Sequence, residues 1–148
     1  MHPRRKAREV AFQVLYQDDL NARVSPSVGE ELLRRRLASD ELLEFGQSLV
    51  AGVRRNRAEI DAALAAAAEH WSLGRMAATD RNVLRLGAYE LLHTDTPPRV
   101  AVDEAIELAR RYGSADSARF VNGILDRLMH AAAAAGADVA PGSRESEP

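Results

Sequence analysis

Hydrophobic and polar positions along the chain recur at the spacing of helix turns. Between breaks rich in Pro, Gly and Ser, apolar residues return every three or four positions, and no stretch alternates at period two as a half-buried strand does. Helices are expected over residues 4–20, 30–37, 40–55, 57–70 and 99–112, with one more between 79 and 93 and a last one that starts after 114 or 116. The pattern therefore predicts an all-α fold, a single-domain bundle of about seven helices.

Short sequence signals mark several of the expected helix ends. Asn56 followed three residues later by Glu59 has the spacing of a capping box. Thr79–Asp80 is expected to cap the helix that follows it, and Ser114 or Asp116 is expected to cap the last one. Pro97–Pro98 predicts a helix start, and Gly113 predicts the C-cap of that helix.

The helix between residues 79 and 93 is apolar over much of its circumference, which predicts a central position in the bundle. The first helix is expected to pack on later ones through one apolar side, consisting of Ala7, Val10, Ala11, Val14 and Leu15. From residue 131 the chain is rich in alanine and carries little large apolar surface. We therefore expect a helical domain over residues 1–130 and a flexible tail over 131–148.

Composition and charge narrow the class of protein. A chain of 148 residues is about one domain, and its net charge of −2 does not by itself indicate a nucleic-acid partner. No apolar run approaches the roughly 18 residues of a membrane span, and the N-terminus lacks the apolar centre of a signal peptide. The absence of cysteine excludes disulfides and thiol catalysis. A cytoplasmic location is expected.

The sequence offers no evident catalytic or metal site. The four histidines stand singly at His2, His70, His93 and His130, without the close spacing of metal ligands. An acidic face formed by Asp103, Glu104 and Glu107 is favoured as a solvated surface, because Arg110 and Arg111 follow Glu107 at ion-pair spacing. Glu90 is favoured as a buried carboxylate paired with an arginine. No enzymatic activity and no cofactor are expected.

The N-terminal segment is the strongest candidate for binding chemistry. Its basic residues are Arg4, Arg5, Lys6 and Arg8, and the aromatic residues near them on a helical wheel are Phe12 and Tyr16. Arginines that neutralise phosphates, interleaved with rings on which bases stack, suit single-stranded nucleic acid. Arg5 also has Glu9 four residues on, the spacing of a helical ion pair. The competing interpretation, favoured for this segment alone, makes the rings a core edge and the arginines a solvated N-terminus.

The stretch "SARFVNGILDRL" raises a second question, because Gly123 lies inside an expected helix and off its apolar stripe. A glycine there costs about 1 kcal/mol relative to alanine. Close packing of a neighbouring helix against Gly123 is the favoured reason. Phe120 lies at the margin of the stripe near Asp116 and Arg127. It is equally well explained as a cap on the core or as a platform on which a base stacks.

Three stretches together resemble the NusB family of bacterial transcription antitermination factors. They are "RRKAREVAFQVLY", "DRNVLRLGAYELL" and "VDEAIELARRYGSADSARFVNGILD", and they span residues 4–128 in order. The resemblance implies a seven-helix bundle in two subdomains without catalysis. It further implies binding to the boxA element of ribosomal RNA transcripts together with NusE, a small-subunit ribosomal protein, in support of processive transcription by RNA polymerase.

The resemblance also assigns roles to individual residues. It places the RNA-binding surface at Arg4, Arg5, Lys6, Arg8, Asp116, Arg119 and Phe120, and it places Tyr16 and Asp80 toward NusE. Phe12 departs from the family pattern, being bulkier than the aliphatic residue expected there, and residues 21–40 carry little of that pattern. Some members of the family form homodimers that cover the N-terminal basic residues Arg4, Arg5, Lys6 and Arg8, here called the basic arm, and others are monomers, so both states stay open.

Two alternative functions remain open at this point. One is a helical protein-interaction scaffold, for which binding of NusE without any RNA affinity would be the discriminating result. The other is a domain without RNA affinity of its own, of the kind that precedes the catalytic domain in certain ribosomal RNA methyltransferases. The second alternative would need a catalytic continuation, which is not expected because the chain ends at Pro148 in a polar tail.

Overall fold

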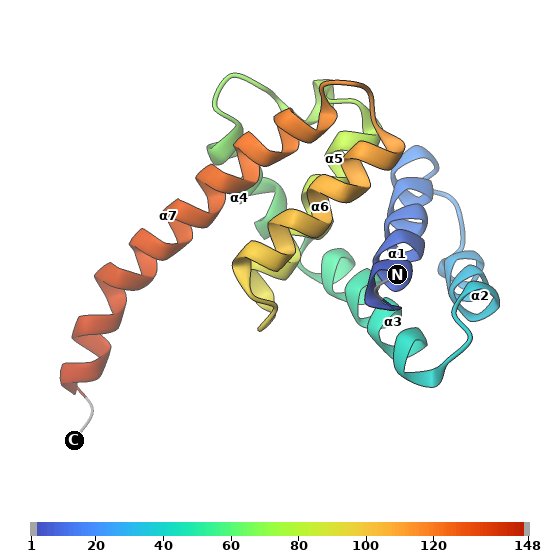
Figure 1. Cartoon of the computed structure of the whole chain (residues 1–148), viewed down its shortest axis with the longest axis horizontal. Coiled ribbons are helices and arrows are strands. Elements are labelled where there is room, and N and C mark those ends of the chain that lie inside the picture. The colour runs from blue at the N-terminus through green and yellow to red at the C-terminus, as the bar shows by residue number, and fades with distance from the viewer. Residues whose placement is uncertain (1–2, 147–148) are drawn as a thin grey trace.

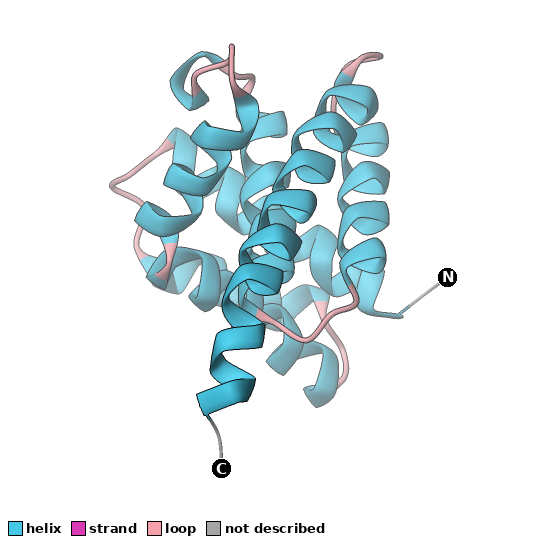
Figure 2. Ribbon diagram, turned by 90° about the vertical axis from the view of Figure 1, so that its left-hand side faces the viewer, coloured by secondary structure: helices cyan, strands magenta, loops and turns pink. Residues whose placement is uncertain are grey.

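The computed structural model describes residues 3–146, and side chains as far as residue 136. Within that range the chain forms helices and loops without strands (Figures 1 and 2). The helices are α1 (Pro3–Leu20), α2 (Pro26–Arg36), α3 (Asp40–Arg55), α4 (Arg57–Ala68), the short 3-10 helix η1 (Leu73–Arg75), α5 (Ala78–His93), α6 (Pro98–Tyr112) and α7 (Ser117–Ser146). The all-α prediction is confirmed.

The helices form two packed groups joined through α5. Helices α1, α2 and α3 contact one another, while α6 and α7 pack together on α5. Helix α5 also contacts α1, α3 and α4, and every residue from Asn82 to Glu90 is buried. Figure 1 shows α6 crossing in front of α5, with α1–α3 to one side. The central position predicted for α5 is confirmed.

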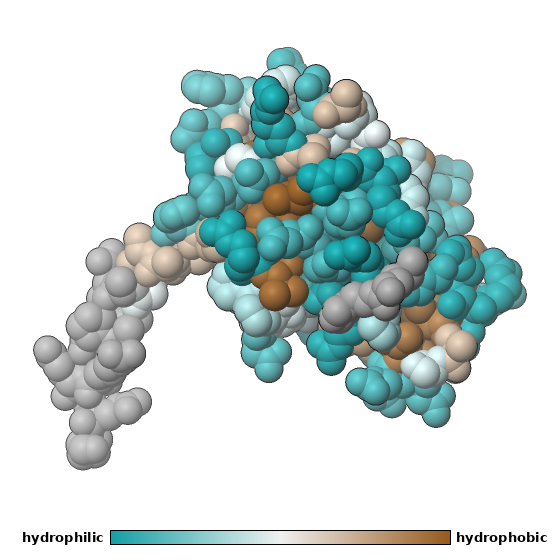
Figure 3. All heavy atoms as spheres, viewed as in Figure 1, coloured by the Kyte–Doolittle hydropathy of each residue, from teal (hydrophilic) through white to brown (hydrophobic). Residues whose placement is uncertain are grey.

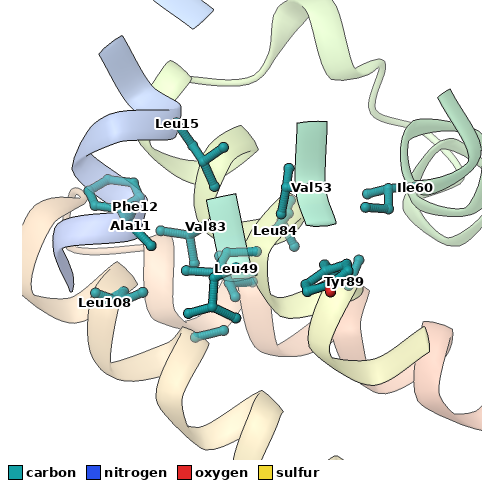
Figure 4. Close-up of a cluster of buried hydrophobic side chains, with 14 of the residues drawn as sticks. Ala11, Phe12, Leu15, Leu49, Val53, Ile60, Val83, Leu84, Tyr89 and Leu108 are labelled. Carbon is teal, nitrogen blue, oxygen red and sulfur yellow. The ribbon is translucent and has the colours of Figure 1, made fainter. Parts of the chain in front are cut away.

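The core lies where the two groups meet. The predicted apolar side of α1 is buried throughout and packs with residues of α3, α5 and α6 (Figure 4). Where α3 packs against α5, a Cβ added to Gly52 would overlap the ring of Tyr89. Only glycine leaves room for the tyrosine ring there. None of the helices in the described part of the chain is long and apolar enough to cross a bilayer.

Several helix ends differ from the sequence prediction. Helix α2 begins at Pro26 rather than residue 30, because Ser25 accepts a hydrogen bond from the Ser27 amide and proline suits the first helical position. The capping box at Asn56 does not form, since its side-chain amide donates back to the Gly52 carbonyl at 2.8 Å. Asn56 therefore satisfies the end of α3 instead of the start of α4.

Helix α5 begins at Ala78, one or two residues before its expected cap. Its N-cap residue is Ala77, so that Thr79 and Asp80 lie inside the first turn, where a carboxylate is favoured by the helix dipole. Helix α6 begins at Pro98 and ends with Gly113 as C-cap, as predicted. The backbone carbonyl of Asp116 accepts the first helical hydrogen bond of α7, from the Phe120 amide. This position agrees with one of the two caps proposed for that helix.

Helix α7 extends further than the sequence pattern indicated. The alanine-rich segment continues the helix as far as Ser146, where a frayed or disordered tail was expected. Alanine has the highest intrinsic helix propensity, which favours helix even where there is little apolar surface to bury. The C-terminal part of α7 projects away from the other helices (Figure 1). The division at residue 130 and the flexibility of the tail stay predictions.

Candidate nucleic-acid interface

The basic arm forms the first two turns of α1, and its members have different surroundings. Arg4 is exposed, and its guanidinium lies 4.4 Å from the centroid of the Phe45 ring. Arg5 is half-buried and donates two hydrogen bonds, of 3.2 and 2.8 Å, to the carboxylate of Glu104. Hydrogen bonding to Glu104 and its negative charge raise the pKa of the Arg5 guanidinium above its ordinary value. Lys6 is half-buried.

Arg8 is an interior residue, only 3% exposed. Its Nε and Nη2 donate to the two carboxylate oxygens of Glu90 at 2.7 and 2.8 Å, and Thr96 donates its hydroxyl to Glu90 Oε2 at 2.9 Å. The pairing predicted for Glu90 is confirmed. Arg8 also lines a hollow of about 370 Å³ beside Arg4 at the start of α6. Because the Arg8 guanidinium is buried and bound to Glu90, it favours a role in positioning α1 over direct contact with an RNA phosphate.

The interleaving of arginines with Phe12 is not present in the fold. Phe12 is buried, with its ring centroid 5.2 Å from that of Tyr112 and 6.1 Å from that of Tyr16. Glu9 does not pair with Arg5, because it faces α6 and accepts a 2.6 Å hydrogen bond from Arg111. For Phe12, the core-edge interpretation was therefore the correct one.

Helix α6 runs beside α1 in the same direction. Glu104, in the middle of α6, contacts Arg5 in the first turn of α1. Arg111, the last residue but one of α6, contacts Glu9 one turn further along α1. Tyr112, the last residue of α6, accepts a 3.4 Å hydrogen bond from Gln13. Burial and a hydrogen bond to Glu9 raise the pKa of the Tyr112 hydroxyl. The outer face of α6 thus joins the basic arm to the start of α7.

The start of α7 presents the second group of predicted site residues. Asp116 and Arg119 are exposed, whereas Phe120 is half-buried. The Phe120 ring packs edge to face with Trp71, with centroids 5.4 Å apart and planes at 80°. A Cβ on Gly123 would meet only the Arg127 guanidinium, at 3.8 Å. The prediction that a neighbouring helix packs closely against Gly123 is therefore wrong.

Tyr16 and Asp80 line two adjoining hollows beside the first turn of α5. Tyr16 lies in a hollow of about 300 Å³ together with Thr79 and Tyr112. Asp80, the next residue along α5, lies in one of about 280 Å³ together with Asp116 and Phe120. The structure thus brings Asp80 together with the α7 part of the predicted RNA surface, while Tyr16 lies in a separate hollow on the other side of Thr79. The basic arm lies at the opposite end of α1.

A partly buried charge cluster fixes the end of α1 to α5. Asp19 accepts hydrogen bonds from Arg81 at 2.7 Å and Asn82 at 2.8 Å, and Arg85 lies 3.4 Å away. Burial alone would raise the pKa of the Asp19 carboxyl, but these hydrogen bonds and the arginine charges hold it below its ordinary value. The cluster sets where Tyr16 and the first turn of α5 meet.

Sequence reasoning missed two contributors to this surface. Glu104 was interpreted as a solvated acidic residue, yet from α6 it faces Arg5 and Arg8 of the basic arm. Trp71 was not considered, although it is 55% exposed beside Phe120. The one sequence feature that could have pointed to Trp71 is that a single tryptophan stands in a predicted loop. No group of three or more candidate metal-ligating side chains occurs among the described residues, and His2 lies outside them.

Comparisons with known proteins identify close relatives. Residues 5–130 match the sequence profile of the NusB family. Transcription antitermination protein NusB of Anaeromyxobacter dehalogenans (strain 2CP-1 / ATCC BAA-258) is 43% identical over 126 residues, which cover 84% of this chain and 89% of that protein. NusB of T. maritima superimposes with a TM-score of 0.78 at 39% identity, covering 88% of this chain and 92% of that one.

A further structural neighbour was solved in a complex. A chain of the crystal structure of antitermination factors NusB and NusE in complex with dsRNA superimposes with a TM-score of 0.79. The two chains are 29% identical, and the match covers 88% of this chain and 98% of that one.

Proposed function

Because the chain belongs to the NusB family, we propose that it is a transcription antitermination factor that binds boxA-type RNA of ribosomal RNA transcripts together with NusE. It acts as a non-enzymatic adaptor in the cytoplasm, and the complex on RNA supports processive transcription by RNA polymerase. The proposal is supported by relatives named as antitermination proteins and by a structural neighbour solved with NusE and RNA.

The observation that carries the RNA-binding role is the position of α6 between the two groups of site residues. Single-stranded RNA runs along α6 from Arg4, Arg5 and Lys6 toward Asp116, Arg119 and Phe120. Arg110 and Arg111 are exposed on the intervening surface. Hydrophilic residues dominate where the C-terminal half of α6 lies (Figure 3). With 15 residues, α6 is about 22 Å long, enough for several nucleotides.

NusE docks on the face that adjoins the far end of this path. Tyr16 and Asp80 line the two hollows at the first turn of α5, and the second hollow is shared with Asp116 and Phe120. A protein bound over Tyr16 therefore touches the surface on which the RNA path ends. This continuity predicts that NusE and RNA bind together more tightly than either alone.

The experiment is binding of a labelled boxA-like RNA and a scrambled control, with and without NusE, at two salt concentrations. Preferential binding that weakens with salt is expected, because arginine–phosphate contacts release counterions. Arg5→Ala should weaken binding and lower the salt slope by about one. Arg35→Ala, an exposed arginine on α2, is the matched control and should leave binding unchanged.

Tyr16→Ala tests the division of the surface between the two partners. It should weaken NusE binding while RNA binding in the absence of NusE stays unchanged. If NusE binds but no RNA does, with or without NusE, the chain is a helical protein-interaction scaffold and the antitermination proposal fails.

A further inference from the structure

The proposed function makes no use of Trp71, the single tryptophan of the chain. The residue lies in the loop between α4 and α5, beside the start of α7, and 55% of its surface is exposed. Its ring packs edge to face with Phe120, so that the two ring planes form a corner. A large indole held in place at the surface offers an aromatic face that no described part of the chain covers completely.

Trp71 and Phe120 are walls of the 280 Å³ hollow that also contains Asp80 and Asp116. Arg75 and Met76 line the same hollow. A second hollow, of about 470 Å³, is lined by His70, Ser72 and again by Trp71 and Arg75. The two hollows therefore share two lining residues, Trp71 and Arg75. Aromatic walls next to a cation suit a nucleotide, whose base is planar and whose phosphate is anionic.

Asp80 supplies an unused hydrogen-bond acceptor at this place. Its Oδ1 is shielded from solvent and has no hydrogen-bond partner among the described residues. Buried polar atoms are nearly always hydrogen-bonded in native proteins, so an orphan acceptor on a residue that lines a hollow indicates a donor that arrives with a ligand. A carboxylate accepts from the exocyclic amino group of a base, for example N4 of cytosine.

We propose that this hollow binds one unstacked nucleobase bearing an exocyclic amino group (adenine, cytosine or guanine), which stacks on Trp71 and donates that group to Asp80. The proposal rests on the proposed RNA-binding function and adds a base-selective position to it. Uracil, which has carbonyl oxygens in place of the amino group, is disfavoured because it would leave two acceptors facing each other. Arg75 lies where a flanking phosphate would pass.

Two observations favour a base over an arginine side chain of a protein partner. Arg75 lines both hollows, and its positive charge repels a cation while attracting a phosphate. The hollow is also continuous with the proposed RNA surface, because Asp116 and Phe120 belong to both. The RNA path along α6 therefore leads directly to Trp71.

The test uses the fluorescence of Trp71 in the full chain, which has no other tryptophan. Single-stranded oligonucleotides of equal length, containing only A, only C or only U, are titrated without NusE. Saturable quenching is expected with the A and C oligonucleotides and several-fold weaker binding with U. Asp80→Asn replaces the acceptor by a group that also donates, so the preference for A and C over U should fall or reverse.

Affinity for a labelled boxA-like RNA gives an independent readout. Trp71→Ala should weaken binding about 5- to 150-fold, the range for loss of one base–aromatic stack. Trp71→Phe retains a ring and should restore most of the affinity, which separates stacking from loss of fold. Val28→Ala removes an exposed apolar side chain on α2 and should change nothing.

Each contrary result has a distinct meaning. RNA binding that depends on Arg5 but leaves Trp71 fluorescence and the Trp71→Ala affinity unchanged overturns the base site while the proposed function stands. Quenching by NusE alone, with no response to RNA, shows that the hollow contacts protein and also overturns it. If no RNA binds even with NusE, the proposed function and the base site fail together.

Discussion

Arg8 and Glu90 are 82 residues apart in sequence and form an ion pair with two hydrogen bonds in the interior. The pair fixes α1 to α5 directly beneath the exposed part of the basic arm. Because both partners are buried, removing one leaves the other charged and without its partner. Such a loss destabilises a protein by about 3–5 kcal/mol.

Arg8→Ala and Glu90→Ala should therefore each lower the free energy of unfolding by about that amount. The double variant should lose less than the sum of the two, because it leaves no isolated charge. Urea denaturation of the four proteins measures this coupling. Additivity of the two single effects would show that the pair makes no specific contribution.

If Arg5 binds an RNA phosphate as proposed, Glu104 competes with the RNA for it, because Arg5 donates two hydrogen bonds to Glu104. Glu104→Gln removes a negative charge beside the proposed phosphate path and loosens the guanidinium. Binding of boxA-like RNA should tighten about two- to fivefold, in line with the modest strength of a partly exposed pair, and its salt dependence should become steeper. Glu31→Gln, at an exposed position on α2, is the control, and an equal gain there would indicate a general charge effect.

Gly123 is open to substitution, whereas Gly52 is not. Gly123→Ala should raise the free energy of unfolding by about 0.5–1 kcal/mol, since a Cβ there meets only a flexible side chain at 3.8 Å. Gly52→Ala should destabilise by about 1–3 kcal/mol or more, because its Cβ would overlap the Tyr89 ring. Thermal or urea unfolding of both variants provides the comparison, and a destabilised Gly123→Ala protein would contradict the open geometry.

The carboxylate of Asp19 makes the free energy of unfolding depend on pH. Its pKa is lowered in the folded protein, so its contribution is present above the ordinary carboxyl pKa of about 3.9 and is lost as pH falls through the lower folded value. Asp19→Asn should be less stable than the parent chain at pH 5–7. The difference should shrink below about pH 4. A difference that stays constant across this range would exclude the carboxylate charge as its source.

The fold could be predicted closely because apolar residues recur at helical spacing in most of its segments. The apolar sides of α1 and α5 are buried as their spacing indicated. Helix ends were less predictable, since a polar side chain can satisfy either of two backbone groups. Asn56 has the sequence of a cap for α4 but donates to the end of α3, and no local pattern distinguishes the two. The family assignment from three motifs is confirmed by the match over residues 5–130.

The site could be predicted only in part, because ion-pair partners are chosen by tertiary packing. Arg5 has Glu9 at ideal helical spacing, yet its partner is Glu104, 99 residues away. In the sequence Arg8 looks like the other members of the basic arm, but in the fold its side chain is buried and pairs with Glu90. A helical wheel orders directions around one helix and carries no information about which neighbour fills them.

The long-range pairing of α1 has a consequence for how the chain is made. Arg5 is translated 99 residues before Glu104, an interval of roughly 5–20 s at about 5–20 residues per second. During that interval the arm emerges from the ribosome before the acidic partners that orient it have been made. A nascent chain that stops short of residue 104 therefore carries the basic residues of the arm but not their ordered arrangement, which is completed only when α6 emerges.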